Sequence, residues 1–347
     1  MKRLDETRLR PGDIILTGGR SKLSLAVRKA LGGEIAHALL YLQFYSAVDS
    51  TMYGVRTSNT QRMLFHEDET VIALRPRADL SADQLRTVLD YARSQNGARY
   101  DLWGAARSRK GTGPSAGNRQ FCSRLVSRAY AAAGIVCHED VDYCSPQHLV
   151  DSELFEEVPD PTVVVSDAEA ARWGRHPNGV DRMWKAQAAL LKGVRRLDDG
   201  VENFEDVVQF VLDHPEKDER VSRLLRRSDF LDVWRFDLKH NPWRTDIGLM
   251  ADMPPDEVDV YCRATLDDEP GGGDRYHQML ATLVHLSGLY DRVSLRRLVT
   301  LYEKLCELHE RRLAVARRWS VLRPASSVPG AGPVTVIAPR SPSVTAG

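Results

Sequence analysis

Short apolar runs separated by turn residues make up much of the first 160 positions of the chain. Four of these runs have the length and composition of β-strands, at residues 13–17, 37–44, 46–50 and 70–76. Gly, Asp and Pro residues punctuate them, as is typical of the turns between strands. The pattern therefore predicts several short strands in this part of the chain.

Helical periodicity occurs between and after these strands. Apolar residues recur at three-four spacing over residues 21–33, which stop at a Gly pair. Ser81 is a suitable N-cap for a helix over 82–95, because its hydroxyl oxygen can accept a hydrogen bond from a first-turn N–H group. A third helix is predicted over 121–134, with Cys122 in its first turn. The first 160 residues are thus expected to combine α and β structure.

From about residue 161 the strand signal nearly disappears and amphipathic helices follow. They are predicted over 180–197, 203–213, 217–239, 255–266, 275–288 and 291–320. We expect a domain over residues 1–160, a separate all-α domain over 161–322 and a flexible tail, rich in Pro, Gly, Ser, Ala and Val, over 323–347.

A leucine stripe follows the last predicted helix. Its members are Leu298, Leu301, Leu305 and Leu308. Such a stripe is consistent with core packing and also with a contact to another chain, which would make the helical domain a surface for a protein partner or for self-association. Core packing is the favoured interpretation.

The charge pattern argues against a polyanionic partner. Forty-eight basic residues balance forty-eight acidic ones, so no global field draws the chain to nucleic acid or to an anionic membrane.

The N-terminal stretch lacks the apolar run of a secretory signal, and no later stretch reaches the length of a membrane span. We expect a cytoplasmic protein without a stable membrane anchor, although export without a cleaved signal stays open.

The five cysteines form an odd and widely scattered set, which favours reduced thiols over a disulfide framework. Cys137, His138, Cys144 and His148 lie close together in sequence, but their spacing matches no paired C-x-x-C arrangement. We therefore expect no metal site, and no motif indicates a cofactor.

Cys122 is the cysteine best placed for chemistry. A thiol is a nucleophile only as thiolate, and a helix N-terminus beside a histidine lowers the pKa of a thiol. His37 opens a predicted strand and is therefore held on a rigid element, and a hairpin would bring Asp49 alongside it. The alternatives are a buried small hydrophobe for Cys122, a hydrogen-bonded core histidine for His37 and a strand-end residue for Asp49.

Several short motifs occur in a recognisable order. They are LRPGDIIL, HALLYL, VDS followed by YGV, YDLWGA and FCSRLV. In this order they resemble the circularly permuted branch of the NlpC-type papain-like superfamily, which includes YiiX-like proteins and, more distantly, lecithin:retinol acyltransferase-like enzymes. The resemblance covers roughly residues 8 to 155. It implies an α+β fold in which an antiparallel sheet packs against the helix that carries the nucleophile.

The resemblance also assigns roles to residues. Cys122 takes the place of the nucleophile, His37 that of its base, and Asp49 falls where relatives have a third polar residue. Tyr100, in YDLWG, matches a tyrosine near the nucleophile, so that a substrate contact is one interpretation and simple packing the favoured one. The backbone N–H of Cys122 is the expected oxyanion donor.

These assignments predict a thiol-dependent hydrolase that acts by nucleophilic acyl transfer on an amide or peptide bond. Ester or lipid acyl chemistry, by hydrolysis or acyl transfer, is the alternative. A third hypothesis is a papain-like binding module without catalytic activity.

Overall fold

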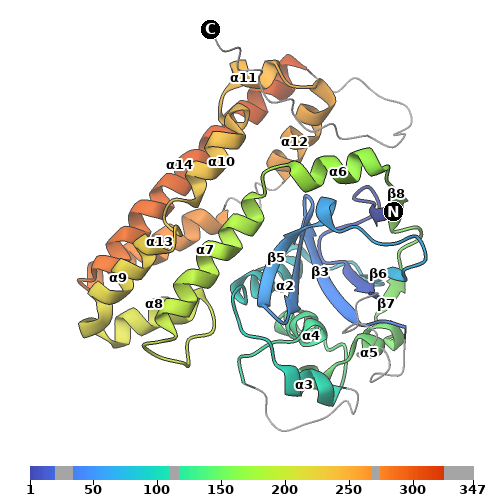
Figure 1. Cartoon of the computed structure of the whole chain (residues 1–347), viewed down its shortest axis with the longest axis horizontal. Coiled ribbons are helices and arrows are strands. Elements are labelled where there is room, and N and C mark those ends of the chain that lie inside the picture. Colours follow the sequence, from blue (N-terminus) through green and yellow to red (C-terminus); the bar gives the residue numbers. More distant parts are fainter. Residues whose placement is uncertain (20–33, 109–116, 268–273, 324–347) are drawn as a thin grey trace. The chain divides into compact units, whose positions relative to one another are not determined.

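The computed structural model describes residues 1–19, 34–108, 117–267 and 274–323 (Figure 1). The chain divides into two compact units, of which the first comprises residues 1–175 and 180–210 and the second residues 176–179 and 211–347. The expected boundary near residue 160 therefore lies inside the first unit. The helix predicted over 21–33 and nearly all of the predicted tail lie outside the described residues.

The first unit is built on an antiparallel sheet of six described strands. Their order across the sheet is β5 (Gly54–Asn59), β4 (Ser46–Thr51), β3 (His37–Gln43), β2 (Ile14–Thr17), β6 (Val71–Pro76) and β7 (Phe155–Glu157). The four predicted strands correspond to β2, β3, β4 and β6. A separate two-stranded sheet pairs β1 (Lys2–Leu4) with β8 (Thr162–Val164). This pairing ties residues 162–164 to the start of the chain and explains why the first unit continues beyond residue 160.

The central strand β2 is buried on both faces, and its alternate residues enter two different hydrophobic clusters. Ile14 and Leu16 pack in one cluster with Leu125 of the helix that begins at Cys122. Ile15 packs in the other cluster, with Phe65. Because side chains alternate across a strand, a single four-residue strand joins both layers of the core. The sheet therefore gives a rigid support to elements on either side of it.

Up to residue 175 the first unit also contains seven described helices and helical turns, most of them between strands. They are η1 (Thr60–Arg62), α2 (Ala82–Ser94), α3 (Leu102–Arg107), α4 (Cys122–Ala132), η3 (Val141–Tyr143), α5 (Pro146–Asp151) and α6 (Asp167–Arg175). The predicted N-cap of α2 is present as a capping box, in which Ser81 accepts from the Gln84 N–H and Gln84 accepts from the Ser81 N–H. Helix α4 contacts β3 and β4, which places the Cys122 helix against the sheet (Figure 1). The predicted α+β class and the antiparallel sheet are confirmed.

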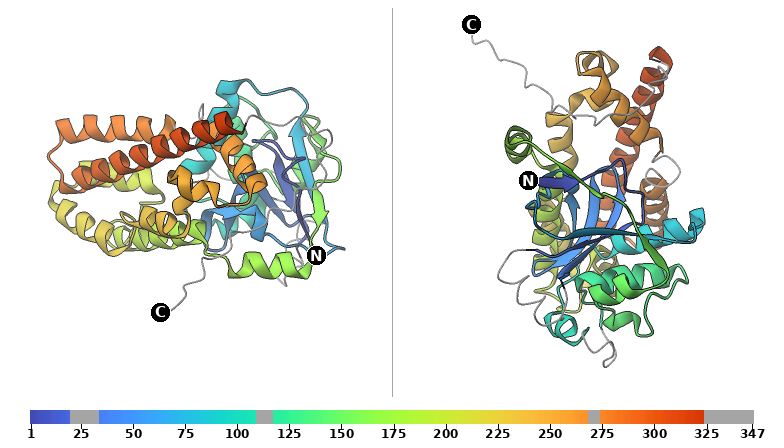
Figure 2. Two further views of the ribbon diagram at one scale, coloured as in Figure 1. Left: turned by 90° about the horizontal axis from the view of Figure 1, so that it is seen from above. Right: turned by 90° about the vertical axis from the view of Figure 1, so that its right-hand side faces the viewer.

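Two helices cross the division between the units, α7 (Gly179–Val194) and α8 (Phe204–Asp213). The second unit then contains η4 (Pro215–Lys217), α9 (Asp218–Arg227), α10 (Val233–His240), η5 (Pro242–Thr245), α11 (Ile247–Ala251), α12 (Pro255–Asp267), α13 (Asp274–Leu289) and α14 (Val293–Leu322). The long helix α14 contacts α9, α12 and α13, and Figure 2 shows it running alongside α13.

Leu298, Leu301 and Leu308 of the leucine stripe are buried. Core packing thus accounts for the apolar character of these three positions. None of the described helices has the length and apolar content needed to cross a membrane.

The prediction of a single helix over 217–239 is wrong, since the structure divides this range into α9 and α10. Asp229, between them, has a positive φ of 62°. Ser228 turns back on the preceding helix by donating to the Leu225 carbonyl at 3.0 Å. Ser and Asp compete with helical hydrogen bonding through their side chains, and Asp tolerates the left-handed region. The apolar periodicity continues across this break and therefore conceals it.

Gly54, the first residue of β5 after the turn from β4, provides a test of the packing at this edge of the sheet. It has a φ of +95°, and a Cβ at this position would lie 2.6 Å from the Ala98 carbonyl oxygen. We expect Gly54→Ala to lower the free energy of unfolding by about 3 kcal/mol, through backbone strain and overpacking. Chemical denaturation measures this change.

Gly174, in α6, is the matched control for this substitution. A Cβ there meets nothing within 4 Å, and α-helical backbone accepts alanine better than glycine. Gly174→Ala should therefore leave the stability unchanged or slightly higher. Equal stability of the Gly54 and Gly174 variants would contradict the packing described for the β4–β5 turn.

Candidate active site

Cys122 is the first residue of α4. Its N-cap residue, Phe121, makes no side-chain hydrogen bond to the helix, so no side chain caps the first-turn N–H groups. The Cys122 residue is buried, with 7% of its surface exposed. The sulfur therefore lies at the positive end of a helix dipole, which stabilises a negative charge.

His37 begins β3 and forms a hydrogen bond with Asp49 of β4. The His37 Nε2 and Asp49 Oδ2 atoms are 2.9 Å apart. Asp49 lies opposite Leu39 in the β3–β4 register, two residues from His37, so the predicted hairpin places both side chains on one face. Because Asp49 occupies Nε2, the other ring nitrogen, Nδ1, is left for a second partner.

The second partner of the imidazole is the thiol of Cys122. Burial lowers the pKa of His37, but hydrogen bonds to Asp49 and Cys122 and the charges of both groups outweigh burial and raise that pKa. Burial raises the pKa of Cys122, but the hydrogen bond and charge of His37 and the N–H groups of Ala38 and Ser123 lower it. The two opposite shifts favour a thiolate next to an imidazolium.

Asp49 is a buried carboxylate, with 4% of its surface exposed. Arg56 of β5 lies directly opposite it in the strand register, with Nε 3.7 Å from Asp49 Oδ1. That oxygen makes no hydrogen bond with the described residues. Asp49 therefore makes its short contact with the His37 ring through Oδ2 and a longer ion pair with Arg56 through Oδ1.

Tyr100 also lies near the thiol. Burial, followed by the charges of Cys122 and Asp101, raises the pKa of the Tyr100 phenol, so this hydroxyl stays protonated. Its backbone forms a parallel bridge with Gln120, two residues before Cys122. The structure thus brings together all four residues that the sequence predicted for the site.

Three residues that the sequence analysis did not select hold the segment before Cys122. The Gln120 carbonyl accepts hydrogen bonds from Ser50 Oγ at 3.1 Å and from the Asp101 N–H at 2.8 Å. Gln120 is fully buried, and its N–H donates to the Arg99 carbonyl. The position of Ser50, next to Asp49 in the VDS motif, was the one available signal for this contact.

Arg124, two residues into the Cys122 helix, is fully buried and binds three other segments of the chain. Its Nη1 donates to Asp101 Oδ2 at 2.7 Å and to the Arg119 carbonyl at 3.0 Å, and its Nε donates to the Asp142 carbonyl at 2.7 Å. Asp101 also accepts from the Gly104 N–H as the N-cap of α3. This arginine therefore fixes the start of α4 relative to the Tyr100 segment. An arginine in a helix gives no hint of such burial in the sequence.

The four residues weighed as metal ligands have other partners. His138 and His148 stack with their ring centroids 4.0 Å apart. The sulfur of Cys144 lies 3.6 Å from the Ser145 carbonyl oxygen, and that of Cys137 lies 4.0 Å from the Ile135 carbonyl oxygen. Within the described part of the chain, His, Cys, Asp and Glu side chains form no group of three that could hold a metal ion.

Comparison with protein families gives a match over the first part of the chain. Residues 8–150 match the model of a family described as permuted papain-like amidase enzymes, YaeF/YiiX, the C92 family. This region has the permuted papain-like fold. The resemblance to YiiX-like proteins is thereby confirmed, and the amidase family supports a hydrolase in general.

Comparison with solved structures also gives matches. The crystal structure of the metalloprotein yiiX from Escherichia coli O157:H7 is 17% identical in sequence, with a TM-score of 0.28. The match covers 44% of this chain and 97% of that chain. None of the curated proteins matches this chain.

Proposed function

We propose that the permuted papain-like domain is a cysteine hydrolase that cleaves an amide or peptide bond. The observation that carries the proposal is the Cys122–His37–Asp49 arrangement, in which a thiol of lowered pKa faces an imidazole held by a buried carboxylate. A structural cysteine needs neither partner. Conversely, the pKa values of Cys137, Cys144 and Cys262 are each raised to about 12, chiefly by burial.

In the proposed reaction the Cys122 thiolate attacks the carbonyl carbon and forms a C–S bond. The resulting oxyanion accepts a hydrogen bond from the Cys122 N–H, at the uncapped start of α4. The C–N bond then breaks, and the leaving nitrogen takes the proton from the His37 imidazolium. Neutral His37 next removes a proton from water, which attacks the thioester. Breaking of the C–S bond releases the acid and restores the thiolate.

Asp49 has two effects on the His37 ring in this cycle. The hydrogen bond to Nε2 fixes the ring orientation, and the carboxylate charge stabilises the imidazolium that donates to the leaving group. Tyr100, whose protonated hydroxyl lies near the thiol, is a candidate for contact with the substrate carbonyl.

Selective alkylation tests the proposal without knowledge of the substrate. At neutral pH we expect iodoacetamide to modify Cys122 about 100-fold faster than the other four cysteines, because only its thiolate is stabilised. All five cysteines are buried, so exposure alone does not separate them. Peptide mapping by mass spectrometry during a time course measures each rate.

Denatured protein is the control, since all five thiols should then react at similar rates. Equal or slower alkylation of Cys122 in the folded protein would remove the basis for a nucleophile. A selective Cys122 that forms no acyl adduct with any amide or ester would instead favour the binding module. The mass of a trapped acyl group distinguishes a peptide from a lipid substrate.

A further inference from the structure

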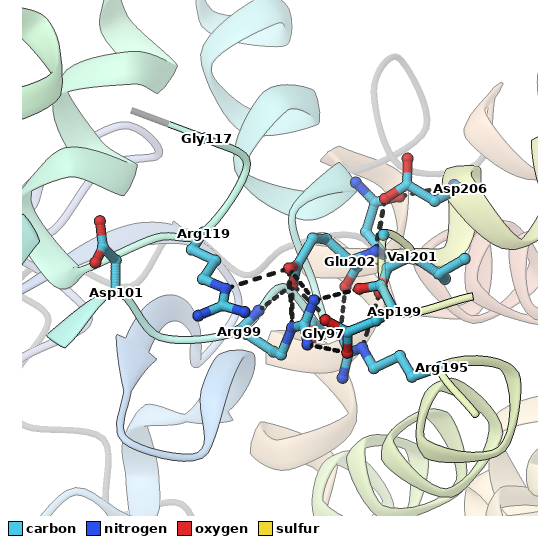
Figure 3. Close-up of polar contacts among 12 residues, drawn as sticks. Gly97, Arg99, Asp101, Gly117, Arg119, Arg195, Asp199, Val201, Glu202 and Asp206 are labelled. Atoms are coloured by element: carbon cyan, nitrogen blue, oxygen red, sulfur yellow. Dashed lines mark hydrogen bonds and ion pairs between the residues drawn. The ribbon is translucent and has the colours of Figure 1, made fainter. Parts of the chain in front are cut away.

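Glu202 is a buried carboxylate in the segment between α7 and α8. It lies outside the region that matches the amidase family, which ends at residue 150, but inside the first compact unit. Only 5% of its surface is exposed. Three arginine side chains, from Arg99, Arg119 and Arg195, converge on it (Figure 3). Burial of a carboxylate is costly unless the charge is paired and hydrogen-bonded, as it is here.

The strongest of these contacts is with Arg99, which binds the carboxylate through both its backbone and its side chain. The Arg99 N–H lies 3.0 Å from Glu202 Oε2, and its Nε and Nη2 lie 2.9 and 2.6 Å from Oε1. Such charge-assisted, forked contacts fix geometry as well as contribute energy. The path of the backbone at Arg99 is therefore set by Glu202.

Arg195 closes the same network from the end of α7. Its Nη2 donates to the carbonyl oxygens of Gly97 at 2.8 Å and Glu202 at 2.6 Å. The α7 side chain of Leu191 packs so closely over Gly97 that a Cβ there would lie 2.2 Å from its Cδ1. Residues 191–202 are thus fitted directly to the segment that leads to Tyr100.

Arg99 and Arg119 precede the two residues of the bridge between Tyr100 and Gln120. The Gln120 N–H donates to the Arg99 carbonyl at 2.9 Å, and the Asp101 N–H donates to the Gln120 carbonyl at 2.8 Å. Glu202, with Arg119 Nε at 3.6 Å, therefore contacts both strands of this bridge. One strand continues to Tyr100, and the other reaches Cys122 two residues after Gln120.

We infer that Glu202 is a positioning residue for the Cys122 site and that the segment from Arg195 to Glu202 completes this site. The inference rests on the proposed function, since it concerns the reactivity of Cys122. Glu202 acts through Arg99, Arg119 and the Tyr100–Gln120 bridge, which together set the start of α4 opposite His37. The catalytic domain accordingly extends beyond the end of the family match.

Glu202→Gln and Asp199→Asn are the paired variants that test this inference. Both remove a carboxylate that binds Arg99, but Glu202 is buried whereas the Asp199 side chain is 80% exposed and lies 2.7 Å from Nη1. In Glu202→Gln the side-chain amide turns an N–H group toward the guanidinium donors, which loosens the Tyr100–Gln120 bridge. We expect Cys122 alkylation at about pH 6 to slow about tenfold in Glu202→Gln and less than about twofold in Asp199→Asn.

The pH profile of alkylation separates positioning from two other effects. Loss of the thiolate–imidazolium contact should move the midpoint of the Glu202→Gln profile upward by about one pH unit. A downward shift would mean that the freed arginine charges act on the thiolate through space, which overturns positioning. An unchanged profile with a lowered melting temperature would show a purely structural role and would also overturn it.

The wild-type protein distinguishes failure of this inference from failure of the proposed function. If wild-type Cys122 is not selectively alkylated, the proposed function fails. If it is selective and Glu202→Gln matches Asp199→Asn, the positioning role alone fails. Should Glu202→Gln not fold, Arg99→Lys keeps the charge but loses the forked contact, and the same upward shift is expected for it. An unshifted profile in Arg99→Lys then decides against positioning.

Discussion

Replacing Cys122 with alanine should abolish amide hydrolysis and leave the fold intact. Without the sulfur no thioester forms, and loss of the nucleophile costs a cysteine or serine hydrolase about four to six orders of magnitude in turnover. Alanine is the best helix former and suits the first residue of α4, so stability should change little. Hydrolysis of a mixed amide and peptide library, with thermal unfolding measured alongside, tests both statements.

Cys137→Ala is the matched control for this variant. Cys137 is also buried, with 6% of its surface exposed, but burial raises its pKa and no histidine hydrogen bond opposes that shift. Its removal should leave activity within about twofold of the wild type. Residual activity of the Cys122→Ala protein well above background would place the nucleophile elsewhere and overturn the proposed mechanism.

Local structure, including part of the candidate site, was predictable where a short motif specifies it. Ser81 and its capping box define the start of α2, and the apolar run that begins at His37 defines β3. The hairpin between β3 and β4 then brings Asp49 to His37 through strand geometry alone. The prediction that Cys122 lies near this pair depended on the order of the motifs, because no local pattern relates residues 37 and 122.

Other elements were missed because their stability comes from distant partners. The edge strand β5, GVRTSN, is mostly polar, and hydrogen bonding to β4 forms it in the absence of an apolar alternation. Strands β1 and β8 have three residues each. They pair although one lies at the start of the chain and the other after residue 160. Glu202 contacts Arg99 across 103 residues, and no motif in the sequence around it predicts this contact. The limits of the first compact unit depend on such contacts, which the shift in composition near residue 160 does not reveal.

Replacing His37 with glutamine should have the second-largest effect, and this effect should depend on pH. His37 and Cys122 hold each other in charged form, since the pKa of the imidazole is raised and that of the thiol is lowered. The reactive pair therefore predominates between the two pKa values, and wild-type activity should rise through the lower one and fall through the higher one. In His37→Gln the thiol returns to an ordinary or higher pKa, since burial alone raises it.

The size of the loss follows from the ionised fraction. A thiol of pKa about 8.5 is only about 0.3% thiolate at about pH 6. A more basic thiolate is also a better nucleophile, which offsets about tenfold of this loss of thiolate. Cys122 alkylation should therefore slow about thirtyfold. Hydrolysis should fall by a further factor of about 100 to 10,000, since the proton donor and acceptor are also lost. Iodoacetamide rates and hydrolysis rates, measured between about pH 5 and 10, separate these two contributions.

Two further variants define what the His37 result means. His66→Gln, which replaces an exposed histidine of the same unit, should change neither profile. Asp49→Asn keeps a polar group beside Nε2 but removes the charge that favours the imidazolium, so it should lower the pH at which activity falls and have a smaller effect than His37→Gln. If His37→Gln alkylates like the wild type at low pH, then the helix terminus alone stabilises the thiolate. The Cys122–His37 pair would in that case not be the origin of its reactivity.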